Sequence, residues 1–235
     1  MNYFLDTCVK IAFVFCTDPW NDETYELFDN KHVFYCSYNV EKEFDGKYND
    51  ILKEHSSFFY ALKDDLNQNF KEYITLSDLK TKSKIIDFER DFDENKKEKI
   101  SEIIWKYTES KHTFNHTLNE DVCKIKDIII FINKLSRSFE SRSLDRRNEF
   151  ERNIIQYPEI DNSYDDLNDK LVNKIDIHKP DNLIIIDAHD LSIEENIPLD
   201  FITLDNKMIL KIKNFLYLLN INNFYYLKEY TIPPT

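Results

Sequence analysis

Two short apolar runs near opposite ends of the chain each end on an aspartate. The first is residues 3–6, Tyr-Phe-Leu-Asp, and the second is residues 201–205, Phe-Ile-Thr-Leu-Asp. A short run of this kind is typical of a strand buried in a parallel sheet. Open α/β sheets carry their chemistry at the carboxyl ends of such strands. The chain is therefore expected to contain a parallel sheet with Asp6 and Asp205 at one edge.

Strand-like and helix-like segments alternate around both aspartates. Residues 32–37 predict a second strand, and Ser37 is a suitable N-cap for a helix that follows it. After a helix that begins at Asp181, the second aspartate-ended strand is followed by a predicted helix over 206–219 and a last strand over 224–227. This alternation predicts an α/β fold in which helices sandwich a parallel β-sheet.

The middle of the chain has a different pattern. Residues 51–176 are mostly charged, with apolar residues such as Phe58 and Leu62 at helical spacing. The sequence therefore predicts a core built from residues 1–50 and 177–235. Residues 51–176 are expected to form a long, mainly helical segment inserted between the two halves of the core or packed on them.

Composition limits the class of protein. The chain has 235 residues, of which 42% are hydrophobic, and a formal net charge of -13. This is apolar enough to bury a core, and the acidic balance argues against a surface that coats nucleic acid broadly. It does not exclude a nuclease, because a cluster of carboxylates that binds metal adds to the negative count.

Other features of the sequence bear on its location. No run of eighteen apolar residues is present, and the N-terminus lacks a basic region followed by an apolar stretch, so neither a membrane span nor a secretory signal is expected. The four cysteines form no CxxC pair, which favours reduced thiols over a structural zinc site. These features favour a cytoplasmic protein.

Two further acids occupy positions comparable to those of Asp6 and Asp205. Glu43 lies in the helix after the second strand, and Asp181 begins the late helix. In a right-handed parallel sheet all four positions meet at one edge. Carboxylate oxygens are the ligands that suit Mg²⁺ or Mn²⁺, which can activate water and neutralise a phosphodiester. The four acids are therefore candidate metal ligands and catalytic residues.

The sequence leaves an alternative open for two of these acids. Asp181 is followed by isoleucines at +3 and +4 and an alanine at +7, as a core helix requires, whereas Asp187 leads to a less apolar stripe. Asp187 is the alternative third acid or an acid of the outer shell. Glu41 is the alternative to Glu43, and residues 41 and 43 lie about 200° apart on a helix, so only one can face the site.

A plain structural interpretation applies to several of these residues. An aspartate at a strand end is often a helix N-cap or a turn residue rather than a metal ligand. Thr7 and Thr203 can hydrogen-bond the acids or support a phosphate contact, but a threonine in a strand needs no function. Four caps in this order are nevertheless less expected than one metal site.

These stretches resemble the PIN-domain family of metal-dependent ribonucleases. The resembling pieces are residues 4–7, the helix start over 37–44, residues 181–188 and residues 201–205, each around one acid of the family's quartet. Cys8 departs from the family, many members of which have a small polar residue there, and the middle segment is longer than in its compact toxin-type members.

The resemblance implies a three-layer α/β/α fold and an endoribonuclease. Such an enzyme hydrolyses RNA phosphodiesters through Mg²⁺ or Mn²⁺ bound by Asp6, Glu43, Asp181 and Asp205. RNA is the expected partner, and a protein partner or a homo-oligomer stays open. Two alternatives remain: a catalytically silent PIN-like binding or scaffold protein, and a structure-specific DNA nuclease.

Positive charge is concentrated in one part of the chain. Residues 121–152 contain eight Lys and Arg against six Asp and Glu, a net of +2, which leaves -15 for the rest of the chain. Arginine forks match phosphate oxygens, so this stretch is the candidate RNA contact. A solvated helix face with i,i+4 ion pairs is an equal alternative. The candidate residues are Arg137, Arg142, Arg146, Arg147 and Arg152.

Overall fold

The computed structural model divides the chain into two compact units. The residues it describes are 1–28, 31–70, 72–86, 98, 101–102, 104–105, 122–160 and 163–229. Unit 1 comprises Met1–Phe15, Trp20–Lys47 and Arg146–Thr235, and unit 2 comprises Cys16–Pro19 and Tyr48–Asp145. Two long helices contribute residues to both units, namely α3 (Tyr38–Asn69) and α7 (Ile125–Asn153).

Unit 1 is built on a five-stranded sheet in the order β5-β2-β1-β6-β7, and all four strand pairs are parallel. The strands are β1 (Asn2–Leu5), β2 (Val33–Ser37), β5 (Ile155–Tyr157), β6 (Leu199–Thr203) and β7 (Asn223–Tyr226). Central β1 places Phe4 opposite Tyr35 of β2 and Phe201 of β6. The predicted α/β class with a parallel sheet is confirmed.

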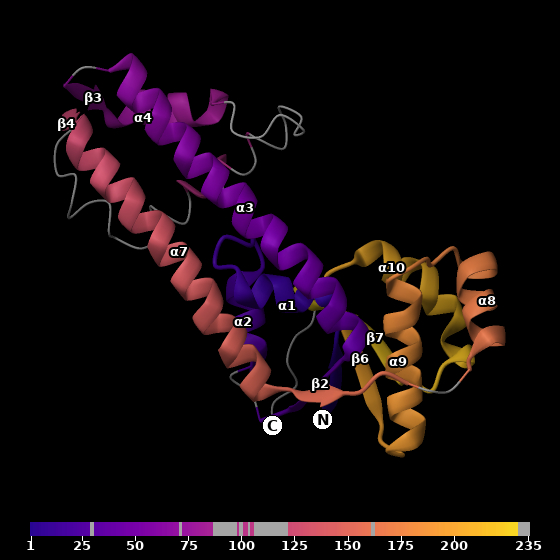
Figure 1. Cartoon of the computed structure of the whole chain (residues 1–235). Coiled ribbons are helices and arrows are strands. Elements are labelled where there is room, and N and C mark those ends of the chain that lie inside the picture. The colour runs from indigo at the N-terminus through magenta and orange to yellow at the C-terminus, as the bar shows by residue number, and fades with distance from the viewer. Residues whose placement is uncertain are drawn as a thin grey trace. The chain divides into compact units, whose positions relative to one another are not determined.

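Helices flank this sheet. Figure 1 shows α1 and α2 on one side of the strands and α8 and α9 on the other. The helical elements of unit 1 besides α3 and α7 are α1 (Thr7–Val14), α2 (Asn21–Phe28), α8 (Asp165–Ile175), α9 (Asp181–Glu194), α10 (Asn206–Ile212) and the 3₁₀ turns η1 (Lys213–Leu218) and η2 (Leu227–Glu229). The arrangement is compatible with three α/β/α layers.

Both faces of the sheet are buried, as a parallel sheet requires. On one face Phe4, Phe201 and Phe224 stack in a row across β1, β6 and β7, with ring centroids 5.6 and 4.7 Å apart. On the other face Tyr3 stacks on Phe34 at 5.9 Å. Alternate residues of β1 thus enter two apolar layers, and this fixes the register that brings Asp6 to the strand end.

Unit 2 has its own apolar core. Its short antiparallel ribbon pairs β3 (Tyr73–Thr75) with β4 (Val122–Lys124), and α4 (Leu76–Ile85) follows β3. The buried cluster draws on α3, α4, α7 and the ribbon, and it includes Phe58, Leu62, Leu66, Ile74, Leu79, Cys123, Ile128, Phe131 and Ile132. Helices thus dominate the described residues of this unit.

The compact units differ from the division expected from the sequence mainly where unit 1 resumes after the inserted segment, and Cys16–Pro19 also cluster with unit 2. The expected insertion over 51–176 also contains residues outside the described ones. Within that range, residues from Arg146 onward cluster with unit 1, since β5 joins the sheet beside β2 and α8 packs on α9. β5 has only three residues, with Ile155 and Gln156 exposed, so no apolar alternation marks it in the sequence.

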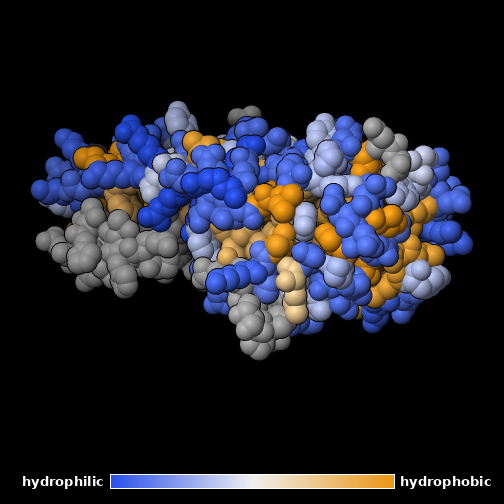
Figure 2. Space-filling model, turned by 90° about the horizontal axis from the view of Figure 1, so that it is seen from below, coloured by the Kyte–Doolittle hydropathy of each residue, from blue (hydrophilic) through white to orange (hydrophobic). Residues whose placement is uncertain are grey.

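One face of the molecule is largely hydrophilic. Hydrophilic residues cover most of the face in Figure 2, and the hydrophobic residues on that face form patches with hydrophilic residues between them. No helix among the described residues combines the length and apolar character needed to cross a membrane.

Candidate functional site

The strand order creates a switch point beside β1. From β1 the chain passes to β2 on one side, while β6 pairs with β1 on the other side. Open α/β sheets bind their ligands outside the carboxyl ends of the strands at such a point. Asp6 directly follows β1, and Asp205 lies two residues after β6. The two aspartates thus lie at the position where this fold places a site.

The carboxylate of Asp6 is buried and fully hydrogen-bonded. It is only 4% exposed. The Thr7 amide donates to Oδ1 at 2.7 Å, and the Thr203 hydroxyl and the Cys8 thiol donate to Oδ2 at 2.6 and 3.0 Å. Burial raises the pKa of Asp6, these hydrogen bonds oppose the rise, and the charge of Glu43 adds to it. Three hydrogen-bond donors therefore hold the Asp6 carboxyl in place.

Thr203 links the two aspartates. Its buried hydroxyl donates to Asp6 and accepts the backbone N–H of Asp205 at 2.9 Å. Oδ1 of Asp205 in turn accepts the N–H groups of Lys207 and Met208 at 2.8 and 3.2 Å, as an N-cap of α10 does. Asp205 thus serves as a helix cap whether or not it also binds a ligand, and the expected hydrogen bond from Thr203 to an acid is present.

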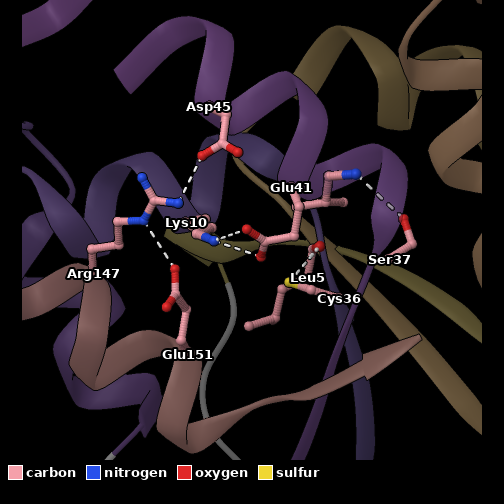
Figure 3. Close-up of polar contacts among 9 residues, drawn as sticks. Leu5, Lys10, Cys36, Ser37, Glu41, Asp45, Arg147 and Glu151 are labelled. Carbon is pink, nitrogen blue, oxygen red and sulfur yellow. Dashed lines mark hydrogen bonds and ion pairs between the residues drawn. The ribbon is translucent and has the colours of Figure 1, made fainter. Parts of the chain in front are cut away.

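Glu43, and not Glu41, lies beside the start of α1. The Thr7 hydroxyl donates to Glu43 Oε2 at 2.6 Å, and Lys47 Nζ lies 2.5 Å from Glu43 Oε1. Glu41 instead pairs with Lys10, whose Nζ is 2.5 Å from both carboxylate oxygens (Figure 3). Both acids thus contact α1, but Glu43 contacts its first residue, next to Asp6, and Glu41 contacts a residue one turn further along.

Asp181, and not Asp187, joins the other carboxylates. Burial raises the pKa of Asp181 to about 6, and the charges of Asp6, Glu43 and Asp205 add to this effect. Asp181 therefore lies within electrostatic reach of the other three acids.

Asp187 belongs to a different polar cluster. It is 1% exposed, and the Asn39 side-chain amide donates to its two oxygens at 3.2 and 3.0 Å. Burial raises the pKa of Asp187 to about 6, while hydrogen bonds from Ser37 and Asn39 oppose the rise. Asp187 thus ties α9 to the start of α3, which carries Glu43.

This pKa leads to a prediction about stability. A carboxyl whose pKa is raised on folding stabilises the fold below its ordinary pKa, and that stabilisation is lost as the pH rises through about 6. Between pH 4 and pH 7, the wild type should lose up to about 3 kcal/mol of unfolding free energy through Asp187. Asp187→Asn cannot titrate at this position and should not show that loss. Hydrogen exchange of the β1 and β6 amides, which belong to unit 1 as Asp187 does, measures the difference across this range. The exposed Asp166→Asn is the control, and equal pH slopes for Asp187→Asn and wild type would contradict the prediction.

The chemistry of the four acids fits a hard divalent cation, but their present geometry does not chelate one. Among the described residues, no three His, Cys, Asp or Glu side chains are grouped so as to hold a metal ion. Thr7, Thr203 and Cys8 hydrogen-bond Asp6 and Lys47 pairs with Glu43, so protein donors already engage both acids. Binding Mg²⁺ or Mn²⁺ would thus exchange some of these contacts for metal contacts.

The predicted arginine cluster is divided between the units. Arg137 and Arg142 belong to unit 2, and the other three belong to unit 1. Arg146 donates to Asn21 Oδ1 at 2.8 Å and stacks on Tyr25, with 4.3 Å from its guanidinium carbon to the ring centroid.

Arg147 and Arg152 also have contacts within unit 1. Arg147 pairs with Asp45 and Glu151 at 2.8 and 2.9 Å (Figure 3), and Arg152 donates to the Asn148 carbonyl oxygen. The ion pair between Arg147 and Glu151 has the i,i+4 spacing of the alternative interpretation. Arg146 and Arg147 therefore have structural roles, and the exposed Arg137, Arg142 and Arg152 are better placed to reach a phosphate.

Two lysines of this region were not singled out from the sequence. Lys47 lies one turn after Glu43, and its i,i+4 spacing is a signal that could have found it. Lys10 carries no such signal, because its partner Glu41 lies on another helix.

Compared with known proteins, the chain matches no family model, no curated protein and no solved structure.

Proposed function

We propose that the chain is a PIN-like, metal-dependent endoribonuclease that hydrolyses RNA phosphodiesters. The observation that carries the proposal is that hydrogen bonds through Thr7 and Thr203 join Asp6 to Glu43 and to Asp205 at the switch point of a parallel sheet. The charges of these three acids also raise the pKa of Asp181. Groups of like charge cost stability when they are held together, so their convergence favours a cationic ligand over four independent helix caps.

Each residue has a definite part in this proposal. A bound Mg²⁺ or Mn²⁺ would supply Lewis-acid activation of water and neutralise charge on the phosphodiester. The four carboxylates would hold the ion, and Thr203 keeps Asp6 oriented through its hydrogen bond. Hydrolysis needs no covalent intermediate on the protein. Among the candidate arginines of unit 1, the exposed Arg152 would contact an RNA phosphate.

One observation favours a second candidate, a silent PIN-like binding or scaffold protein. Asp6 and Asp205 already have the hydrogen-bond donors that a structural role requires. In that case the acids cap helices and the fold presents a surface to a partner.

Binding of Mn²⁺ separates these candidates. A ligand that binds only the native state stabilises it by mass action, by about 2.7 kcal/mol at 100 times its Kd. We expect millimolar Mn²⁺ to raise the melting temperature of unit 1, followed by the loss of amide protection in β1 and β6 on heating, by about 5 °C or more. Na⁺ at matched ionic strength is the control. No shift with Mn²⁺ would favour the scaffold.

Cleavage assays then define the substrate. We expect endonucleolytic products from single-stranded RNA with Mg²⁺ or Mn²⁺ and none with EDTA. Flapped DNA is the matched substrate in the same buffer. Cleavage of the flap and not of the RNA would replace the ribonuclease with a structure-specific DNA nuclease.

A further inference from the structure

Among the described residues of unit 1, Lys47 is the only basic residue that forms an ion pair with one of the four acids. It lies on α3, one helical turn after Glu43, and its Nζ is 2.5 Å from Glu43 Oε1. The Glu43 side chain is 13% exposed, whereas that of Lys47 is 52% exposed. The ammonium group therefore reaches a mostly buried carboxylate from a position that borders on solvent.

The charge of Lys47 interacts with the charges of more than one acid. Partial burial disfavours its charged form, but the hydrogen bond and charge of Glu43 and the charges of Asp6 and Asp181 outweigh this and raise the pKa of Lys47. The charge of Lys47 in turn lowers the pKa of Asp181. Lys47 thus forms an ion pair with Glu43 and lies within electrostatic reach of Asp6 and Asp181.

The two oxygens of Glu43 differ in how easily their present hydrogen-bond partner can be displaced. Oε2 accepts the hydroxyl of Thr7, which is 1% exposed and fixed at the start of α1. Oε1 faces Lys47, whose long and half-exposed side chain can swing into water. A cation that approaches Glu43 therefore meets the least resistance at Oε1, where it must displace the ammonium group.

We propose that Lys47 is a displaceable internal cation that holds Glu43 in the metal-free protein and competes with a divalent ion for Oε1. This inference rests on the proposed function, because it concerns the same carboxylates. Lys47 offsets their repulsion without the metal, and it weakens metal binding because its contact with Glu43 must first be broken. A like charge left near the ion adds to this effect.

Titration calorimetry with Mn²⁺ tests the proposal on the full chain. We expect Lys47→Met to bind Mn²⁺ about tenfold more tightly than wild type, since a unit charge near a divalent ion at a partly exposed site has an effect of this order. Lys42→Met is the matched control: Lys42 is an exposed lysine of the same helix, and the substitution changes the net charge equally. Lys47→Gln is the second variant, in case the methionine variant does not fold.

A second readout needs no metal. Without Mn²⁺, Lys47→Met should melt several degrees below Lys42→Met, and saturating Mn²⁺ should remove that difference. A lysine that only stabilised α3 would lower the melting temperature without tightening Mn²⁺ binding.

The outcomes distinguish this inference from the proposed function. If wild type binds Mn²⁺ and both Lys47 variants bind it equally or more weakly, the role of Lys47 is wrong and the metal site stands. If neither wild type nor the Lys47 variants bind Mn²⁺, both proposals are overturned.

Discussion

Asp6→Asn is expected to reduce RNA cleavage more than about 100-fold while unit 1 stays folded. Substitution of groups that merely support metal ligands commonly costs 10- to 100-fold, and Asp6 would be a ligand itself. Asparagine has the same shape but lacks the charge that a divalent ion requires. A gel-based cleavage assay of the purified variant with Mg²⁺ or Mn²⁺ measures the loss.

The fold should tolerate this change because the neighbours of Asp6 can adapt. The asparagine oxygen can still accept the Thr7 amide, which donates to Oδ1 in the wild type. Its nitrogen then faces the Thr203 hydroxyl and the Cys8 thiol, whose hydrogens rotate to let them accept. Loss of a buried charge beside Glu43 also relieves repulsion. Stability should therefore stay within about 1 kcal/mol of wild type.

Asp200→Asn is the matched control for the chemistry. Asp200 lies near the start of β6, whereas Asp205 follows its carboxyl end, and Asp200 accepts a hydrogen bond from Asn223 at 2.8 Å. The Asp200→Asn variant should cleave RNA like wild type. Wild-type activity of Asp6→Asn would show that Asp6 is a helix cap alone, and the proposed mechanism would be wrong.

The sequence predicted the sheet edge better than it predicted the partners of the acids. Asp6 and Asp205 follow apolar runs whose strands are buried on both faces, and such runs can be recognised from the sequence without tertiary information. The isoleucine stripe after Asp181 likewise predicted the helix correctly, since Ile184 and Ile185 are fully buried.

Other features depend on contacts that no local pattern encodes. The helical sequence does not show which of Glu41 and Glu43 lies beside Asp6. The contacts with α1 decide it, since Glu41 pairs with Lys10 and Glu43 accepts a hydrogen bond from Thr7. β5 is a short edge strand that pairs with β2 and lacks an apolar alternation. Its place in the sheet follows from its partner strand and not from its own residues.

The second large effect concerns the buried ion pair of unit 1. We expect Glu41→Gln to destabilise unit 1 by about 3 kcal/mol, because it leaves a buried ammonium group without its counter-ion. Lys10 is 0% exposed, and its Nζ contacts both oxygens of Glu41 at 2.5 Å (Figure 3). Its other close neighbours are the rings of Phe44 and Phe150, with centroids 4.3 and 5.2 Å away, which cannot replace a carboxylate.

Hydrogen exchange measures this effect in the correct unit. The chain has two compact units, so a single unfolding curve would mix their transitions. Amides of β1 and β6 belong to unit 1 and should exchange about 100-fold faster in Glu41→Gln, the factor that 3 kcal/mol implies. Glu151→Gln is the control: it weakens the more exposed pair with Arg147 and should cost less than about 1 kcal/mol. Equal exchange in the two variants would contradict the expected role of the buried pair.

The double variant Lys10→Met with Glu41→Leu separates the two consequences of the pair. Apolar side chains of similar size commonly replace a buried ion pair without loss of stability, so exchange of β1 and β6 should return to within about tenfold of wild type. The pair lies close to Glu43 in the structure, because Glu41 and Glu43 both contact α1, at Lys10 and at Thr7 respectively. If the double variant is stable but binds Mn²⁺ more weakly than wild type, the charge pair orients Glu43 in addition to stabilising the fold. If it is stable and binds Mn²⁺ like wild type, apolar packing between α1 and α3 is sufficient to orient Glu43.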